Sequence, residues 1–455
     1  MSHIPPSRHT GPASSTAAPE TRLGRTLYSM TWPMIYGVVA LMGYQLVDSV
    51  YISILGTEPL AALGFTVAVN QLFIGVQIGL GIAATALISQ AIGAQDVRWA
   101  RDLGGLVLTA GSSIMAILCV VIWLTQDMIL TVLGADPALW PLIGRYWVPW
   151  LISIWLGATL YFAYSIARAQ GNTRLPGSVM VITSLLNLAL DPVFIFVFEW
   201  GLPGAAWASA TAFAIGSIIM WRSVKRHRWV RYRKLKLIAG TGLRQLGMIS
   251  GPAMISQLMP GMAAMTATTI VAGFGAPAVA AWALGTRLES FSIVVVLALT
   301  MSLPPMVGRY IGAGDYASLD KLVLLAVRFV LMLQLAIAVL WLGLSFVLPS
   351  ALSDDPQVAG YLGTWFVLVP LSYGALGTCM LMVSVANATG MPLRAVLISV
   401  LRLFAFYLPA LWLGAQIAGM TGVYAGVLVG NVVAGIVSWL IYRRAIHSTQ
   451  TAATP

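Results

Sequence analysis

Long apolar runs separated by short polar connections dominate this chain and decide what it can fold into. They lie near residues 27–55, 60–92, 103–125, 141–166, 177–198, 204–222, 246–273, 278–308, 322–348, 360–385, 395–416 and 421–442. A helix needs about 20 mainly apolar residues to cross a bilayer, and it satisfies its own backbone hydrogen bonds there. The pattern therefore predicts an all-α membrane protein with twelve transmembrane helices.

The composition excludes a soluble globular protein. Of the 455 residues, 59% are hydrophobic and only 9% are charged, whereas soluble domains carry about 25% charged residues. The formal net charge is +11. It does not indicate a nucleic-acid partner, because the basic residues stand in short groups between the apolar runs, where they set a membrane topology. Membrane lipid is the expected surrounding.

The basic residues gather on one side of the predicted membrane layer. They precede the first run or follow the even-numbered runs: Arg8, Arg22, Arg25, Arg98, Arg101, Arg168, Arg174, the cluster within 222–244, Arg309, Lys321, Arg394, Arg443 and Arg444. The opposite connections hold Glu58, Asp127, Asp136, Glu199, Asp354 and Asp355, with Arg145. Basic loops remain in the cytoplasm. We therefore expect a multi-pass membrane protein with both termini cytoplasmic.

These boundaries divide the chain into five parts. Residues 1–26 are predicted to be a disordered cytoplasmic tail, because Ser, Thr, Pro and Ala dominate them. Residues 27–222 and 246–444 are two six-helix bundles, and 445–455 are a second cytoplasmic tail. Residues 223–245 form a basic cytoplasmic connector, which we interpret as a topology anchor and linker, with binding of anionic lipid as the alternative.

The two halves repeat each other. Pairs of turn residues are separated by a constant 219 positions: Pro33 and Pro252, Gly56 and Gly275, Gly93 and Gly312, Asp96 and Asp315, Asp136 and Asp355, Gly171 and Gly390. Because six spans are an even number, both halves have the same topology and are related by a pseudo-two-fold axis along the membrane normal. Two bundles facing a central cleft can rock about their interface, which is the basis of alternating access.

Two acids lie inside the first half, where a lipid-exposed carboxylate would cost about 2.5–3.5 kcal/mol. Asp48 is eight residues before Gly56 and Asp191 eight before Glu199, so both carboxylates are predicted at similar depth. Asn187 shares a helical face with Asp191. Ser209 reaches a comparable level from the sixth run, and Tyr44 is placed to hydrogen-bond Asp48.

Two acids at one depth in a low dielectric cannot both be ionised cheaply. Such a pair is suited to take a proton from outside and release it inside. Two alternatives stay open: structural acids held by hydrogen bonds, and a sodium site built from Asp, Asn and Ser oxygens.

A third acid, Glu289, lies about three turns into the eighth run, and its counterpart in the first half is Asn70. Glu289 is either structural or faces the cleft as a contact for a cationic substrate. Methionines of the seventh run, including Met259 and Met262, either form an adaptable binding surface or pack ordinarily.

No cofactor, metal or enzyme motif stands out. No lysine has the context of a phosphate-binding loop, and His3, His9, His227 and His447 all lie outside the apolar runs. Cys119 and Cys379 lie within apolar runs and suit small packed side chains. We therefore expect a non-enzymatic protein driven by ions, with no cofactor.

Several of these motifs resemble those of one family. The segment Val47–Val50 with Leu55–Gly64, the segment NLALDPVFIF from Asn187, and Gly204–Ser209 are similar to the first-, fifth- and sixth-span signatures of the multidrug and toxic compound extrusion (MATE) family. Residues 285–312 resemble its DNA-damage-inducible-type bacterial subgroup, which implies a location in the bacterial inner (plasma) membrane. The resemblance runs from about Thr31 to Arg444.

The resemblance implies a secondary antiporter that expels organic, often cationic, drug-like compounds in exchange for protons or sodium. It also implies that Asp48, Asn187, Asp191 and Ser209 form the cation-coupling cluster. Neither the seventh run nor residues 360–385 contain a carboxylate, which favours coupling in the first half, by protons.

We expect a monomer. The alternative within transport is a lipid-linked oligosaccharide flippase, because Arg287 and Arg402 could serve an anionic headgroup.

Overall fold

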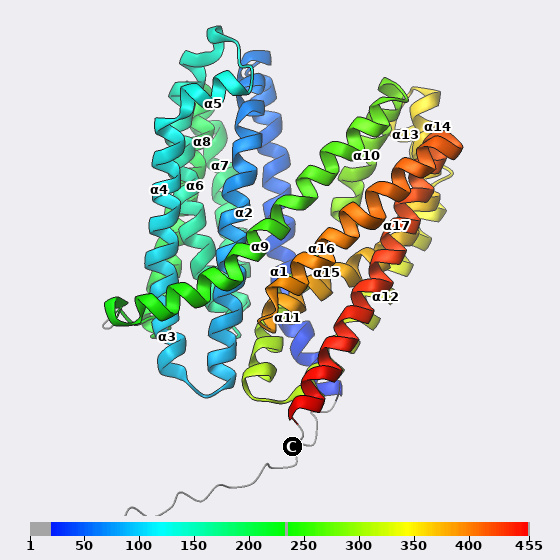
Figure 1. Ribbon diagram of the computed structural model, residues 1–455. Coiled ribbons are helices and arrows are strands. Elements are labelled where there is room, and N and C mark those ends of the chain that lie inside the picture. The colour runs from blue at the N-terminus through cyan, green and yellow to red at the C-terminus, as the bar shows by residue number, and fades with distance from the viewer. Residues whose placement is uncertain (1–19, 233–234, 454–455) are drawn as a thin grey trace, which may run out of the picture.

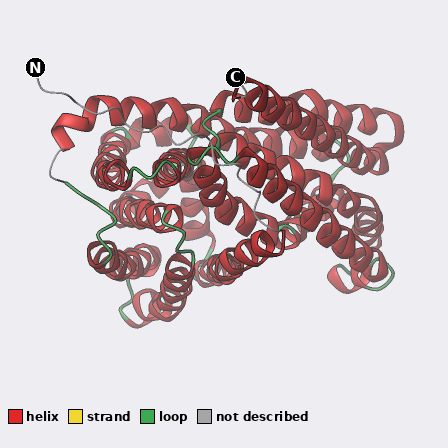
Figure 2. Cartoon of the chain, turned by 90° about the horizontal axis from the view of Figure 1, so that it is seen from below, coloured by secondary structure: helices red, strands yellow, loops and turns green. Residues whose placement is uncertain are grey.

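The computed structural model describes residues 20–232 and 235–453. Figure 1 shows two groups of helices, α1 to α8 and α9 to α17, which lie close together at one end and diverge towards the other. Seen from below that view, the described residues form only helices and loops (Figure 2). The predicted all-α class is confirmed.

The first bundle contains the helices of the first half. They are α1 (Glu20–Ile54), α2 (Thr57–Gly93), α3 (Val97–Leu106), η1 (Val107–Gly111), α4 (Ser112–Leu124), α5 (Gln126–Val132), η2 (Pro137–Leu139), α6 (Trp140–Ala169), α7 (Arg174–Pro192), η3 (Val193–Val197) and α8 (Gly201–Arg226). The elements η1 and η3 are π-helical turns, and η2 is a 3-10 turn.

The second bundle repeats this order. It contains α9 (Leu235–Ala272), α10 (Ala276–Ser292), α11 (Val294–Gly312), α12 (Tyr316–Leu344), α13 (Leu348–Leu352), α14 (Pro356–Leu368), η4 (Val369–Ser372), α15 (Tyr373–Ala388), α16 (Pro392–Val400), η5 (Leu401–Tyr407) and α17 (Leu408–Ala453). The element η5 is π-helical, and η4 is a 3-10 turn.

Twelve spans follow from these elements. Among the described residues, 11 helical segments are long and apolar enough to cross a membrane, and the last of them, Pro392–Ile446, has 55 residues. Its backbone leaves the helical conformation at Ala418 and Gly419, where Gly419 has φ 57°. A chain of that length with a break in its middle makes two spans, which gives the twelve that the sequence predicts.

Several helices extend beyond the predicted domain boundaries. Of the predicted tail at 1–26, residues 1–19 lie outside the described residues, and 20–26 are helical in α1. The predicted connector at 223–245 begins inside α8 and ends inside α9, and α17 continues to Ala453. Hydropathy marks where a chain enters the apolar layer, whereas helical hydrogen bonds propagate past it into water.

The internal repeat has a backbone basis. Gly56 and Gly275 have φ of 109° and 94°, in the region that favours glycine, and both precede a helix. Asp96 and Asp315 cap α3 and α12 by accepting from the backbone N–H groups of Trp99 and Ser318 at 2.9 and 3.0 Å. Equivalent turns therefore form through equivalent local chemistry in both halves.

The bundles meet along α2, which packs against both α9 and α11. Glycines allow the close approach: Gly75 faces Leu258, and Gly79 faces Met254. The α1–α11 contact adds a hydrogen bond between the buried hydroxyls of Thr31 and Ser302, 2.7 Å apart. We call the end with the α2–α3 and α11–α12 turns the basic end, since Arg98, Arg101, Arg309 and Lys321 flank those turns.

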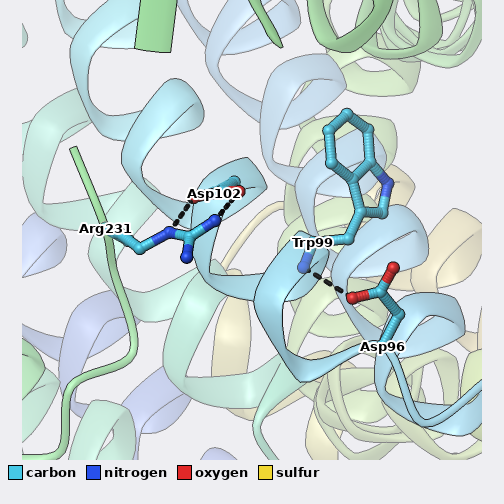
Figure 3. Close-up of polar contacts among 4 residues, drawn as sticks. All are labelled: Asp96, Trp99, Asp102 and Arg231. Atoms are coloured by element: carbon cyan, nitrogen blue, oxygen red, sulfur yellow. Dashed lines mark hydrogen bonds and ion pairs between the residues drawn. The ribbon is translucent and has the colours of Figure 1, made fainter. Parts of the chain in front are cut away.

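The connector between the bundles is attached to α3 at the basic end. Figure 3 shows the Arg231 guanidinium donating to both oxygens of the buried Asp102 carboxylate, each at 2.5 Å. The Arg231 backbone N–H also donates to the Arg101 carbonyl at 3.0 Å. The hydrogen bonds to Asp102 raise the pKa of Arg231. A bidentate pair of this kind fixes both position and orientation.

We predict that Asp102→Asn loosens this connector. The substitution removes the negative charge that holds Arg231 while leaving the side-chain volume unchanged, so trypsin should cleave within 225–236 several-fold faster in the purified protein. The control is Asp320→Asn, which removes the ion pair to Arg443, 3.1 Å long, on α12 and α17. Equal cleavage rates in wild type and Asp102→Asn would contradict the prediction.

Candidate functional site

The structure brings together the side chains that we call the acid cluster: Asp48 on α1, Asn187 and Asp191 on α7, and Ser209 on α8. Asn187 and Asp191 are both 0% exposed. With its amide nitrogen towards Asp191, Asn187 donates to Oδ1 at 2.8 Å and Oδ2 at 3.1 Å, and its oxygen accepts from the Ser209 hydroxyl at 2.9 Å. This orientation satisfies all three groups, because a carboxylate accepts and a hydroxyl donates.

Asp48 completes the cluster from the neighbouring helix. Its side chain is half-buried, and Oδ1 is enclosed without a hydrogen-bond partner. Asp48 and Asp191 are close enough for their charges to repel, and Tyr44 lies within reach of both charges. The predicted hydrogen bond from Tyr44 to Asp48 is not formed here. The enclosed oxygen therefore remains available for a proton or a cation.

Two further groups near the cluster are not evident in the sequence. Tyr146 of α6 is 5% exposed and lies beside Thr66 of α2, close to Asp48 and Tyr44. Nothing distinguishes Tyr146 in the sequence from the other aromatic residues of its apolar run. Only the packing of α2 and α6 against α1 reveals it.

The helix is irregular directly after Asp191, because the next residue is Pro192. Pro192 has no N–H to donate, so the helix loses one hydrogen bond at Leu188. The chain continues as the π-helical turn η3, a form that is common where a helix is adapted to a function. Phe196 of this turn packs edge-on against Tyr51 of α1, with ring centroids 6.1 Å apart, which draws α7 towards Asp48.

The second bundle has no equivalent of the acid cluster. The residues 219 positions after Asp48, Asn187, Asp191 and Ser209 are Ala267, Phe406, Ala410 and Leu428. None of these four residues is polar, so the second bundle does not repeat the acid cluster at this spacing.

A cavity of about 410 Å³ lies where the bundles face each other, and we call it the central cavity. The first bundle contributes residues of α2 and α6, and the second contributes residues of α9, α10, α11, α15, α16 and η5. Its charged lining residues are Arg168, Glu289 and Arg402. A cavity of this volume accommodates a drug-sized organic molecule.

The predicted cleft residues separate into two groups. Glu289 lines the central cavity, whereas Asn70, Met259 and Met262 are not among its lining residues. Met259 is 9% exposed and packs with Ala263 and Leu403, and Met262 is 59% exposed. The periodicity of an apolar run does not reveal which of its faces meets the other bundle.

The central cavity ends at a contact between the two bundles at the basic end. Gln90 of α2 donates to the carbonyl of Ala388 at 2.7 Å, and Arg309 of α11 donates to the carbonyl of Ala169 at 3.3 Å. Gln90 and Arg309 are 219 positions apart, and so are Ala169 and Ala388. The two hydrogen bonds are therefore the same interaction, made once in each direction across the pseudo-two-fold axis.

Glycines bring the backbones together in the same contact. A Cβ on Gly93 would overlap the carbonyl oxygen of Arg309, and a Cβ on Gly312 would overlap that of Gln90. We call Gln90, Gly93, Ala169, Arg309, Gly312 and Ala388 the closing contact. The sequence signalled Gly93 and Gly312 through their repeat spacing but did not show that they face each other's half.

We predict that Gly93→Val opens the basic end, because its side chain cannot fit beside the Arg309 carbonyl. In a chain with alanine at 119 and 379, alkylation of Ala388→Cys by an impermeant maleimide should accelerate about tenfold, a population shift of about 1.4 kcal/mol. The reagent is applied to everted vesicles. Gly144→Val is the control, since a Cβ there meets nothing within 4 Å. Unchanged labelling would show that this contact does not hold the bundles together.

Comparison with known proteins agrees with this architecture. The MatE family model matches residues 33–193 and 252–413. The Vibrio cholerae MATE transporter VcmN is 49% identical in sequence, and its crystal structure in the bent form covers 94% of this chain and 98% of its own with a TM-score of 0.92.

Two curated relatives are more distant. A FAD transporter of Shewanella oneidensis is 29% identical over 93% of this chain and 95% of its own. The multidrug export protein MepA of Staphylococcus aureus is 22% identical over 92% and 93%. All three relatives are named as transporters or export proteins. The DNA-damage-inducible-type subgroup is not tested by these comparisons and stays a prediction.

Proposed function

Because the chain belongs to the MatE family and is therefore a membrane transporter rather than an enzyme, we propose that it is a secondary active antiporter. It exports organic compounds across the bacterial inner membrane by alternating access. The observation that carries this proposal is the acid cluster in one bundle together with a central cavity between the two bundles.

The proposed orientation places the basic end in the cytoplasm, with both termini, as the distribution of arginine and lysine favours. The closing contact then seals the cavity from the cytoplasm, while the bundles diverge on the opposite side (Figure 1). This arrangement corresponds to a conformation open to the outside. Rocking of the bundles about α2 and α11 would break the closing contact and expose the cavity inward.

Coupling is proposed to act through the acid cluster. With Asp48 and Asp191 both ionised, repulsion between two buried carboxylates destabilises the cluster, and a proton from outside relieves it. The side-chain amide nitrogen of Asn187 donates to Asp191 on α7 and its amide oxygen accepts from Ser209 on α8, so a change of charge at Asp191 alters the contact between these two helices. Sodium is the alternative coupling ion, because carboxylate, amide and hydroxyl oxygens also bind hard cations.

The proposed substrates are organic, drug-like compounds with a cationic centre, for which Glu289 supplies a negative charge in the central cavity. Export of multidrug type is supported by the similarity to MepA. The similarity to a FAD transporter extends the candidates to larger planar compounds with phosphate groups. We propose that the chain works as a monomer and needs no cofactor.

A lipid-linked oligosaccharide flippase is the second candidate, since Arg168 and Arg402 line the cavity and suit an anionic headgroup. The acids Asp48 and Asp191 have no evident role in that function. Expression of the chain in a drug-sensitive strain and in a strain lacking its envelope flippase separates the two: rescue of envelope synthesis without drug resistance supports the flippase.

We predict that Asp48→Asn and Asp191→Asn each reduce ion-driven ethidium uptake into everted vesicles at least about tenfold, because neither amide can take up and release a proton. Uptake is measured with an inside-acid pH gradient. In a separate experiment at uniform pH, it is measured with a sodium concentration that is higher inside the vesicles than outside. Asp127→Asn, an exposed acid on α5, serves as the control.

The two gradients distinguish the coupling ions. If the variants lose only the uptake that the pH gradient drives in wild type, protons are the coupling ion. If they lose only the uptake that the sodium gradient drives, sodium is the coupling ion. Wild-type rates in both variants under either gradient would contradict the assignment of the acid cluster.

A further inference from the structure

One charged group of the central cavity has no role in the proposed coupling. Arg168, near the end of α6, is 4% exposed, and its Nη2 donates to the Ser165 hydroxyl at 2.8 Å. Its guanidinium carbon lies 5.1 Å from the centre of the Tyr161 ring, and its Nε is buried without a partner. No carboxylate of the described residues forms an ion pair with it within 4 Å. The charge of Arg168 is therefore uncompensated.

The acid of the cavity interacts electrostatically with a different cation, although the two form no ion pair within 4 Å among the described residues. Glu289 attracts Arg402, which lines the same cavity from η5. Glu289 is the lone acid among the described residues that line the cavity, beside two arginines. With Glu289 ionised, these three side chains carry one net positive charge. An isolated buried charge is costly, so a cavity with this balance favours an occupant that supplies the missing negative charge.

A second unsatisfied group lies on the other side of the pseudo-two-fold axis. Asn387 is 219 positions after Arg168 and lines the same cavity. It is 2% exposed, and its Oδ1 is buried without a partner. Arg168 and Asn387 immediately precede Ala169 and Ala388, whose carbonyls accept the two hydrogen bonds of the closing contact. Both unsatisfied groups thus stand next to the contact that closes the cavity.

We propose that Arg168 and Asn387 form a binding site for an anionic group, a carboxylate or a phosphate, of the molecule that occupies the central cavity. The planar guanidinium offers paired donors that match either anion. The Asn387 amide nitrogen can donate to the same anion, whereas its unpartnered Oδ1 accepts and therefore requires a donor group of the same molecule. This inference rests on the proposed export function and refines its substrate class. The preferred substrates carry an anionic group beside any cationic centre, as in a zwitterion.

Two rhodamine dyes test this. Rhodamine 110 carries a free carboxylate, and rhodamine 123 is its methyl ester, so the pair differs in that one anionic group. Binding of each dye to the purified full-length protein in phosphatidylcholine nanodiscs is measured by fluorescence anisotropy, without any ion gradient. Wild type should bind rhodamine 110 about tenfold more tightly than rhodamine 123, as one charge-assisted pair implies.

The variants locate the effect. Arg168→Gln should lose about tenfold in affinity for rhodamine 110 and none for rhodamine 123, whereas Arg168→Lys, which retains the charge, should keep part of the preference. Arg145→Gln, which removes an exposed arginine of α6 outside the cavity, is the matched control. A wild type that binds both dyes equally, or an equal loss of both dyes in Arg168→Gln, would overturn the proposal.

A second arm identifies the source of the anion. Nanodiscs containing phosphatidylglycerol should leave the binding of rhodamine 110 unchanged if the site serves a soluble substrate. Displacement of rhodamine 110 by this lipid in wild type, but not in Arg168→Gln, supports the same anion site and assigns it to a lipid headgroup. Because the dye-binding measurements need no ion gradient, the two proposals can fail independently. Equal binding of both dyes would overturn the anion site without affecting gradient-driven ethidium uptake. Absence of ethidium uptake would overturn the antiport proposal without affecting the dye preference.

Discussion

An ionised side chain within a bilayer is stable only where protein or water surrounds it, and this constraint orders the structure. The costs are several kcal/mol for each charge placed in hydrocarbon. Asp191 is accordingly fully enclosed behind Asn187 and Ser209. Arg168 and Glu289 instead face the central cavity between the bundles. These charged groups thus lie either in the acid cluster or at the central cavity.

The repeat separates mechanics from chemistry. Both halves share the helix order, the glycine turns, the aspartate caps and the two halves of the closing contact. In the proposed transport cycle these features serve the movement of one bundle against the other. The polar groups differ: Asp48 and Asp191 correspond to Ala267 and Ala410, and Arg168 corresponds to Asn387. A symmetric scaffold with asymmetric side chains allows ion and substrate to occupy different sites of one two-state device.

Each of the two polar sites adjoins a contact between helices. The acid cluster lies where α7 packs on α8, and the central cavity lies next to the closing contact. Asn187 joins Asp191 to Ser209 across the two helices, so the acid cluster lies within a helix interface. Gln90 and Arg309 hold the carbonyls next to the cavity residues Asn387 and Arg168. A bound ion and a bound substrate would each bias the position of the bundles through differential contacts, as alternating access requires.

Much of the fold and part of the site could be predicted from the residues. The spans, the two bundles and the repeat depend on hydropathy and turn residues, which act locally. The approach of Asp48 to Asp191 was predictable too, because equal distance along two helices from one membrane surface places residues at equal depth. Depth does not specify the angle at which a side chain faces, however. For this reason the sequence could not show that Asn70 and Met262, both expected in the cleft, do not line the central cavity.

The chain's own pattern thus determined how many times it crosses the membrane and at what depth its polar groups stand, because lipid selects residues by their solvation energy. The tertiary structure decided which faces meet. The closing contact and the electrostatic attraction between Glu289 and Arg402 arise between residues more than a hundred positions apart, and the uncompensated charge of Arg168 arises from the lack of a nearby carboxylate among the described residues. Such relations depend on how helices rotate and pack against each other, and the period of an apolar run carries no information about that.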